Sequence, residues 1–412
     1  MKKTKLRIDR IIIALVVLLL IIFIIIKLFT AVISKLNYKN TMIDLSNLTQ
    51  VEVEEYATKN NLKLTINEVI NKASVGTIIS QSIKENTVIK KNDQLIVEIS
   101  KGIDYSSYNV NEVGDVPIMM YHGIHDITDN KYTGGNIDKD GYQRTASAFR
   151  NDLEFYYNSG YRMIRLSDYV DGIVDVEAGL SPIIITFDDG LSNNIKVTGL
   201  NSDGSIIIDP NSAVGILEEF KKKHPDFNVT ATFFINGGLF NQSEYNEKIL
   251  NWLIDNGYDI GNHTYSHVDF TTVDSTKSIK EVGSMYKMLD KYIKDKYVNI
   301  VALPFGSPYK KTHDNFKYIM NGVYENYEYT TKAALRVGWE AEVSCFNKNF
   351  DKTFLKRIRA YDNNGSDFDI KYNFKVLEKT RYISDGDKTT IVVPASKLDK
   401  VSNNYNLEVI SY

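Results

Sequence analysis

Cysteine is nearly absent from this sequence, with Cys345 the single one in 412 residues. One cysteine cannot form a disulfide within the chain, so a hydrophobic core must hold the fold together. The sequence also lacks a basic excess, because its formal net charge is −3 although its first ten residues are rich in Lys and Arg. The rest of the chain is therefore acidic, which disfavours polyanions and argues against nucleic acid as a partner.

A long apolar run near the N-terminus predicts a membrane span. It extends from Ile11 to Ile33 and is interrupted only by Lys27 and Thr30. About 20 apolar residues match the hydrocarbon core of a bilayer, and a basic flank stays on the cytoplasmic side. A cleaved signal peptide is the alternative, but its apolar region is shorter and ends in a small-x-small site. We expect residues 1–35 to be a cytoplasmic tail and an uncleaved transmembrane signal anchor, with the rest of the chain outside the cell.

Residues 42–102 form one predicted α+β unit. Ser46 or Thr49 can cap a helix, and the runs LKLTI, TIISQS and QLIVEIS alternate as half-buried strands do. This order, with VGTIISQS and the final IVEISKG, resembles the PASTA domain of penicillin-binding proteins and bacterial Ser/Thr kinases. The resemblance implies a wall-binding module, and a spacer is the alternative. The polar residues 103–115 are expected to be a linker.

From Val116 onward, strand-like runs alternate with helix-like stretches. PIMMYH, PIIITF, TATFFI, YDIGNHTYSH, NIVALP and RVGW are typical of strands, and residues 145–160, 211–224, 245–257 and 276–296 are typical of helices. This alternation predicts an α/β fold with a parallel sheet, for which both a barrel and a doubly wound sheet are suitable. In either architecture the active site lies at the carboxyl ends of the strands.

Histidine and aspartate residues follow these strand-like runs. Only six histidines occur in the chain, and His122, His263 and His267 come at the ends of such runs. Because His263 and His267 are four residues apart, a helical turn or a tight loop can direct both rings at one point. With a carboxylate they form a two-His, one-carboxylate metal set. The adjacent Asp188 and Asp189 repel one another unless a divalent cation absorbs the charge, so we expect one to bind metal and the other to handle protons.

TFDDG, TATFFINGG and GYDIGNHTYSH together resemble the polysaccharide deacetylases, the NodB-homology group or carbohydrate esterase family 4. The resemblance covers residues 116–361 and implies a distorted (β/α) barrel. It implies that Asp188 is the general base, and that Asp189, His263 and His267 hold a divalent metal, Zn²⁺ ahead of Co²⁺.

This resemblance also implies an activity and a location. The expected reaction is hydrolysis of the N-acetyl group of N-acetylglucosamine units in a cell-wall glycan, peptidoglycan first, with release of acetate. A poly-N-acetylglucosamine exopolysaccharide as substrate is one alternative, and a catalytically inert wall-binding protein is another. Together with the anchor, the resemblance predicts a single-pass protein of the cell membrane whose catalytic domain is extracellular.

Two features depart from the family pattern. Ala302 stands where the family often has an Arg that steadies the base, and no histidine follows His313 to act as the usual C-terminal acid. Exopolysaccharide N-deacetylases resemble a circular permutation in which the corresponding strand comes first, as MYH. PIMMYHGI fits that pattern, so His122 is expected to be the catalytic acid, with a structural histidine as the alternative. The matching Pro304 and Phe305 imply that a backbone N–H near Phe305 stabilises the oxyanion.

The remaining sequence gives weaker expectations. Trp339, in RVGW, could line a sugar-binding face or belong to the core. Residues 200–211 predict a hairpin-like turn after the strand that carries the two aspartates. Residues 362–412 contain the strand-like runs YNFKVLEKTRYI, KTTIVVPAS and NLEVISY. We expect a β-rich C-terminal extension there.

Overall fold

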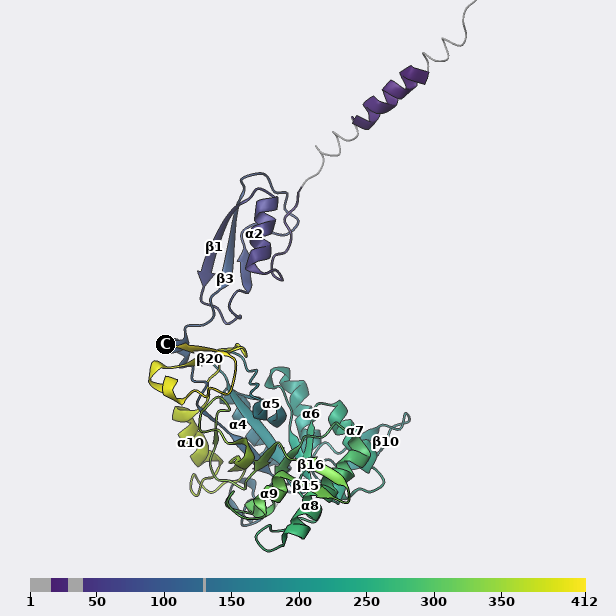
Figure 1. Cartoon of the computed structure of the whole chain (residues 1–412), viewed down its shortest axis with the longest axis vertical. Coiled ribbons are helices and arrows are strands. Elements are labelled where there is room, and N and C mark those ends of the chain that lie inside the picture. The colour runs from purple at the N-terminus through teal and green to yellow at the C-terminus, as the bar shows by residue number, and fades with distance from the viewer. Residues whose placement is uncertain (1–15, 29–39, 129–130) are drawn as a thin grey trace, which may run out of the picture. The chain divides into compact units, whose positions relative to one another are not determined.

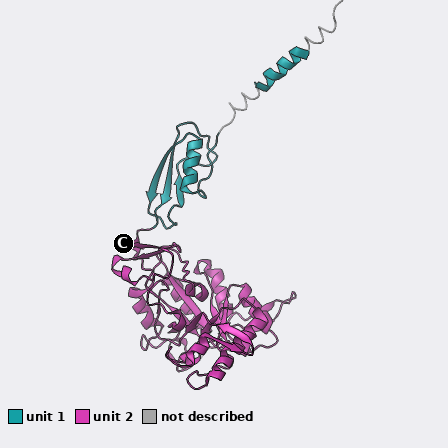
Figure 2. Ribbon diagram, viewed as in Figure 1, with its two compact units in different colours: residues 1–102 teal, residues 103–412 magenta. Residues whose placement is uncertain are grey.

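The computed structural model describes residues 16–28, 40–128 and 131–412 (Figure 1). Contacts divide the chain into two compact units, Met1–Gly102 and Ile103–Tyr412 (Figure 2). Each unit is built around its own buried apolar residues.

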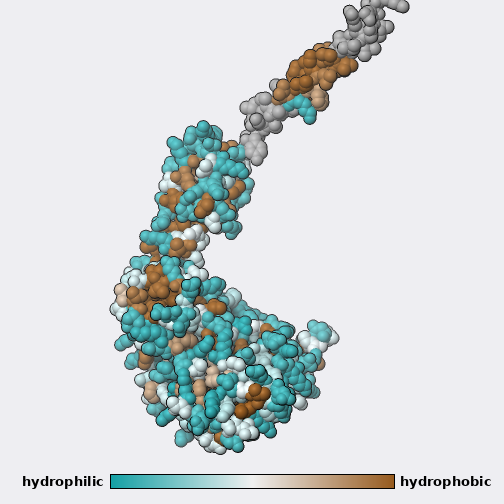
Figure 3. Space-filling model, viewed as in Figure 1, coloured by the Kyte–Doolittle hydropathy of each residue, from teal (hydrophilic) through white to brown (hydrophobic). Residues whose placement is uncertain are grey.

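The predicted membrane location is contradicted by the described residues. Residues 16–28 form an apolar helix, which Figure 3 shows in brown. Within residues 16–28, 40–128 and 131–412, no helix is both long and apolar enough to cross a membrane. Residues 1–15 and 29–35 of the predicted tail and anchor lie outside the described residues.

The first unit contains the predicted helix and three strands. They are α2 (Gln50–Lys59), β1 (Lys63–Val69), β2 (Ile78–Gln81) and β3 (Gln94–Ser100), with β3 central, parallel to β1 and antiparallel to β2. Thr49 begins the helix through a capping box, because its hydroxyl accepts from the Glu52 N–H while the Glu52 carboxylate accepts from the Thr49 N–H at 2.7 Å. Val53 and Ala57 face inward, which joins the helix to the sheet.

The second unit is organised by an eight-stranded sheet. Its strands are β5 (Ile118–Tyr121), β8 (Tyr161–Met163), β9 (Ser181–Phe187), β12 (Thr232–Ile235), β13 (Asp259–Asn262), β14 (Ile300–Ala302), β17 (Ala333–Leu335) and β19 (Ile358–Arg359). The order is β17-β14-β13-β12-β9-β5-β19, β8 also pairs with β9, and every pair is parallel. Isolated bridges from Leu335 to Leu355 and from Trp339 to Ile358 draw the two edges together. The sheet is therefore a curled, parallel half-barrel.

Helices follow the strands as predicted. They are α3 (Tyr105–Tyr108), α4 (Ala146–Asn158), α5 (Leu166–Val170), α6 (Ala213–Lys223), α7 (Asn246–Asp255), α8 (Ser275–Ile293), α9 (Phe316–Met320) and α10 (Ile370–Thr380). The four predicted helical stretches are α4, α6, α7 and α8 (Figure 1). Short 3-10 turns are η1 (Thr133–Gly135), η2 (Pro225–Phe227), η3 (Leu239–Asn241), η4 (Pro304–Gly306), η5 (Lys352–Phe354) and η6 (Ala395–Lys400).

The curled sheet is buried on both faces. Along β9, Ile183, Ile185 and Phe187 belong to the core shared with the helices. Ile184 belongs to a second core on the inner face of the curl. Because side chains alternate along a strand, Asp188 continues the inner face defined by Ile184. The inner face therefore leads directly to the predicted site.

Paired short strands complete the second unit. They are β4 (Asp115–Val116) with β18 (Glu342–Val343), β6 (Gly123–His125) with β7 (Gln143–Thr145), β10 (Val197–Leu200) with β11 (Ile206–Ile208), β15 (Asn321–Tyr324) with β16 (Tyr327–Thr330), and β20 (Thr390–Val393) with β21 (Glu408–Ser411). The pair β10 and β11 is the predicted hairpin after β9.

Three stretches differ from the prediction. Residues 372–383, predicted as a strand, lie mostly in α10, because Ile370, Phe374 and Leu377 repeat at helical spacing and are buried together. The run RVGW is not a strand, since β17 ends at Leu335. The segment predicted as a linker, residues 103–115, is packed into the second unit and buries Val110.

Candidate active site

The predicted site residues follow the carboxyl ends of neighbouring strands. His122 follows β5, Asp188 and Asp189 follow β9, and His263 follows β13. Tyr121 of β5 pairs with Phe187 of β9, so the residues after both strands leave the sheet at the same level. The parallel sheet thus collects side chains from distant parts of the sequence at one edge.

Three of these residues form a compact ligand set. Nε2 of His263 lies 3.2 Å from Oδ1 of Asp189, and Nε2 of His267 lies 3.3 Å from the same oxygen. The three ligand atoms all lie within 4.8 Å of one another, and the described part of the chain contains no other group of this kind. The three residues predicted to hold a metal are therefore brought together.

The set has the geometry and chemistry that a tetrahedral divalent metal requires. Ligand bonds of about 2.0 to 2.1 Å on a tetrahedron place two ligand atoms about 3.3 Å apart, as both His–Asp contacts are. Nε2 of His263 is buried and has no hydrogen-bond partner among the described residues. Its Nδ1 lies 2.9 Å from the Ala302 carbonyl, which fixes the ring with Nε2 directed at Asp189.

The loop that carries both histidines has a strained backbone. Thr264 has φ 62° and His267 has φ 53°. A β-branched residue rarely adopts positive φ, so the surrounding structure must impose this shape. The Asn262 side chain accepts a hydrogen bond from the Thr264 N–H at 2.8 Å. This bond ties the beginning of the loop to the end of β13.

A buried glutamate holds the second half of that loop. Glu281 of α8 is 1% exposed. Its carboxylate accepts hydrogen bonds from the Ser266 N–H at 2.7 Å and from the Ser266 hydroxyl at 2.6 Å, and pairs with Lys277 at 2.7 Å. Because Ser266 directly precedes His267, Glu281 fixes the position from which the His267 ring reaches Asp189.

Asp188 is paired with an arginine that sequence reasoning missed. Nη1 of Arg357 donates to Oδ1 of Asp188 at 2.8 Å, and Nη2 donates to Oδ2 at 2.7 Å. Both side chains are essentially inaccessible to solvent. Burial alone would raise the pKa of Asp188, but the Arg357 and His263 charges outweigh it, so the pKa lies below its usual range. Asp188 is therefore held as an oriented carboxylate.

Arg357 reaches Asp188 along the inner face of the curl. Its Nε donates to the Arg336 carbonyl at 2.8 Å, and Nη1 also donates to the Thr186 hydroxyl at 3.1 Å. In the sequence, Arg357 stands within LKRIRAY, directly before β19, the last strand of the eight-stranded sheet. Its partner could not be identified without knowing that β19 lies next to β5.

His122 extends the strand beside Asp188. Its ring packs edge-on against Tyr142, with 4.8 Å between centroids, and its backbone carbonyl accepts from the Asn194 side chain at 2.7 Å. Nδ1 is buried and has no hydrogen-bond partner among the described residues. Burial lowers the pKa of His122, while the charges of Asp188 and Asp189 oppose that shift. A buried imidazole near Asp188, with one ring nitrogen free of protein hydrogen bonds among the described residues, suits a role in proton transfer.

The remaining predicted residues lie after the ends of β14 and β17. Pro304 and Phe305 lie in η4, directly after β14. The Phe305 ring is 56% exposed and packs edge-on against the His267 ring, with 4.6 Å between centroids. Trp339 is 49% exposed, so it is not a core residue.

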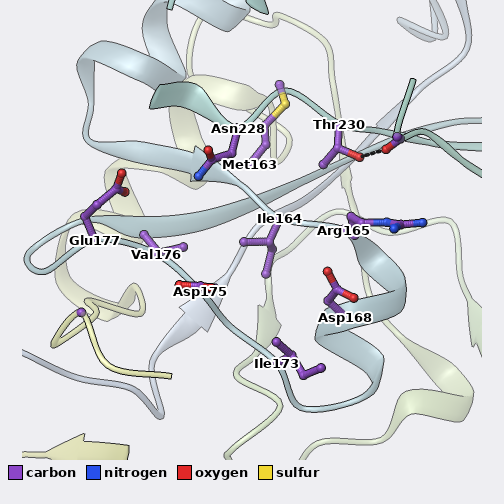
Figure 4. Close-up of a pocket in the computed structure, with 12 residues that line it drawn as sticks. Met163, Ile164, Arg165, Asp168, Ile173, Asp175, Val176, Glu177, Asn228 and Thr230 are labelled. Carbon is purple, nitrogen blue, oxygen red and sulfur yellow. Dashed lines mark hydrogen bonds between the residues drawn. The ribbon is translucent and has the colours of Figure 1, made fainter. Parts of the chain in front are cut away.

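A separate pocket lies at the opposite edge of the sheet (Figure 4). Asn228 and Thr230, which precede β12, and Gly257, which precedes β13, line it together with residues from the loop after β8. None of the predicted site residues belongs to this pocket. It is distinct from the cluster at the carboxyl ends of the strands.

The fold and the cluster define an α/β half-barrel domain in which an arginine-paired carboxylate stands beside an Asp-His-His ligand set. Residues 176–320 match the polysaccharide deacetylase family, and residues 40–101 match the PASTA domain. The chain thus carries a polysaccharide deacetylase domain and a PASTA domain, and the predicted enzyme class, a de-N-acetylase hydrolase, is confirmed. A divalent metal suits the Asp-His-His set of this domain.

Solved structures of deacetylases are similar to this chain at low identity. The Streptococcus pyogenes deacetylase PplD, solved in complex with acetate, is 17% identical, with 65% of this chain and 98% of that chain covered and a TM-score of 0.45. A de-N-acetylase from Aggregatibacter actinomycetemcomitans is 11% identical, with 59% and 94% covered and a TM-score of 0.39. Among curated proteins, none matches the sequence significantly.

Proposed function

We propose that this protein removes the N-acetyl group from N-acetylglucosamine units of a cell-wall glycan, with peptidoglycan as the substrate, and releases acetate. The convergence of Asp189, His263 and His267 beside the Arg357-paired Asp188 carries this proposal. The PASTA domain supports a wall glycan as the substrate, because the module it resembles is attached to penicillin-binding proteins.

Asp189, His263 and His267 would hold a divalent metal, and we propose Zn²⁺. When bound, the metal polarises the acetamide carbonyl and makes a water molecule acidic enough to attack near neutral pH. Asp188 accepts the proton from the attacking water while the oxygen of that water bonds to the carbonyl carbon. Arg357 keeps the Asp188 carboxylate ionised before the attack and oriented throughout.

His122 and the turn after β14 complete the reaction. Protonated His122 donates its proton to the amide nitrogen as the carbon–nitrogen bond breaks, so a free amine and acetate leave. The backbone N–H near Phe305 donates to the oxyanion that forms on the carbonyl oxygen, a contribution of about 3 to 4 kcal/mol in comparable sites. Pro304 fixes the backbone entering this turn.

Acetate release from chitotetraose and from purified peptidoglycan tests the proposal. The full chain loaded with Zn²⁺ should release acetate, and Asp188→Asn should retain metal but lose turnover by about 100-fold or more. His122→Ala should retain metal and lose turnover to a similar extent. If His122→Ala is as active as the parent, the assignment of His122 as the acid is wrong.

Poly-N-acetylglucosamine is a second candidate substrate. His122 at the end of β5 favours it, because this MYH arrangement resembles the exopolysaccharide N-deacetylases. A kcat/KM higher on poly-N-acetylglucosamine than on peptidoglycan would select this candidate. Absence of acetate release from every N-acetylated glycan, with Zn²⁺ or Co²⁺, would instead favour an inert wall-binding protein.

A further inference from the structure

A second arginine, Arg359 at the end of β19, lies near the same site. Arg359 lies two residues after Arg357, so both side chains leave the strand on the inner face of the curl. Arg359 pairs in register with Met120, two residues before His122. Arg359 is thus the member of the pair nearer the carboxyl edge, where the site opens.

Two aromatic rings hold the Arg359 side chain. Its guanidinium carbon lies 3.9 Å from the centroid of the Tyr361 ring and 5.4 Å from that of the Tyr142 ring. The Tyr142 ring in turn contacts the ring of His122. The guanidinium is therefore fixed one aromatic ring away from the expected catalytic acid.

Arg359 has no carboxylate partner among the described residues, although it is half-buried. The two fully buried arginines of this unit are paired, since Arg357 binds Asp188 and Arg144 binds Asp152 and Asp362. Removing a guanidinium from water without an anion is unfavourable. The carboxylate of Asp188 is fully engaged by Arg357, so no described carboxylate neutralises Arg359.

We propose that Arg359 binds an oxyanion, a carboxylate or a phosphate, carried by the glycan close to the acetamido group under attack. The planar guanidinium presents paired N–H donors that match either group. This inference rests on the proposed deacetylase function and narrows its substrate class. The substrate is an acidic glycan, such as one with carboxylate-bearing substituents, rather than a neutral homopolymer.

Kinetics on three matched substrates test this inference. They are chitotetraose, which is neutral, a peptidoglycan oligomer, which carries carboxylates, and an N-acetylglucosamine oligomer that carries phosphate. Arg359→Ala should raise KM by about 10-fold or more on one acidic substrate. The kcat on that substrate and both constants on chitotetraose should stay within about 2-fold. Arg359→Lys should recover part of the loss, and the acidic substrate affected identifies the source of the oxyanion.

Arg336→Ala is the matched control. The Arg336 guanidinium also stacks on two rings, 5.7 Å from Trp339 and 4.8 Å from Phe354, and makes no ion pair among the described residues. Arg336 is two residues after Ala334, which belongs to the core between the sheet and the helices. Because side chains alternate along a strand, the Arg336 side chain leaves from the outer face of the sheet and not from the inner face that carries Arg359. Arg336→Ala should leave KM on the acidic substrates unchanged.

Calorimetry of each oligomer binding to the parent and to Arg359→Ala tests the inference even if the protein releases no acetate. Weaker binding of an acidic oligomer alone supports it. Equal losses on neutral and acidic oligomers would show a structural role and overturn it, as would no loss on either acidic one. A parent that binds acidic oligomers through Arg359 but releases no acetate would overturn the proposed function and leave the inference standing.

Discussion

Arg357 binds both carboxylate oxygens of Asp188, at 2.8 and 2.7 Å, across 169 positions of sequence. The pair is buried on the inner face of the curled sheet, between β19 and the end of β9. It supplies the contact that the sequence lacks at Ala302, where related enzymes often carry the arginine. The residue directly before β19 therefore completes the site formed by the preceding strands.

Replacing Arg357 by Gln should damage both stability and turnover. Asp188 would remain buried without its partner, and losing one member of a buried ion pair costs about 3 to 5 kcal/mol. Turnover should fall by about 100-fold, because the base loses its orientation. Urea unfolding and acetate release measure the two effects. The double variant Arg357→Gln with Asp188→Asn should recover part of the stability, and a fully stable, fully active Arg357→Gln would contradict the assigned role.

Glu281→Ala should weaken metal binding. Without its carboxylate, Ser266 loses two hydrogen bonds and the strained loop no longer presents His267 to Asp189. Loss of such a supporting contact typically costs 10- to 100-fold in metal affinity, measurable by competition with a chromophoric chelator. Glu281→Gln should lose less, since an amide can still accept from the Ser266 N–H.

A buried glutamate far from the cluster serves as the control for this experiment. Glu112 is also 1% exposed and accepts from the Tyr382 hydroxyl and the Val392 N–H, both at 2.8 Å. Glu112→Ala should destabilise the fold but leave the metal affinity of the folded protein unchanged. Equal losses of metal affinity in both Ala variants would mean that Glu281 acts only through overall stability.

The stability of Glu112→Gln relative to the parent should depend on pH. Burial and the neighbouring Asp385 raise the pKa of Glu112 well above 4.5. The folded parent therefore keeps a proton that the unfolded chain releases, and this group lowers the unfolding free energy as pH rises from about 4.5 through the raised pKa. Gln does not titrate, so the variant should gain stability relative to the parent over that range. Urea unfolding across pH checks this, and a constant difference would contradict it.

Cys345 should be unreactive until the protein unfolds. Its side chain is 1% exposed, and burial raises the pKa of the thiol. Because the thiolate is the reactive form, labelling by a disulfide reagent should require unfolding. The fraction of Cys345 labelled in a fixed time should rise with urea concentration in parallel with unfolding. Rapid labelling of the native protein would show that this core is open.

Most helices and strands could be predicted because their periodicity or apolar runs depend only on neighbouring residues. The helical period of α8 and the apolar run of β9 ending in two aspartates each depend on neighbours in sequence. The polar residues at strand ends were predicted to converge because parallel strands share a carboxyl edge. Arg357 was missed because its partner depends on β19 lying beside β5, a contact that no local pattern encodes.

The errors have equally physical causes. Tyr372, Phe374 and Val376 alternate as in a strand, yet only Phe374 is buried, since α10 follows the spacing of Ile370, Phe374 and Leu377. The membrane prediction relied on continuous apolarity from Ile11 to Ile33. Among the residues that the structure describes, no helix is both long and apolar enough to span a bilayer.

Zinc titration of the metal-free parent and of His263→Ala, each followed by acetate release from chitotetraose, tests the central claim most directly. The account predicts that the parent binds one Zn²⁺ per chain and releases acetate only when it is loaded. It predicts that His263→Ala binds at least about 100-fold more weakly and releases none, because the buried Nε2 directed at Asp189 is gone. Acetate release by His263→Ala at the rate of the parent, or by the parent after complete removal of metal, would contradict the account.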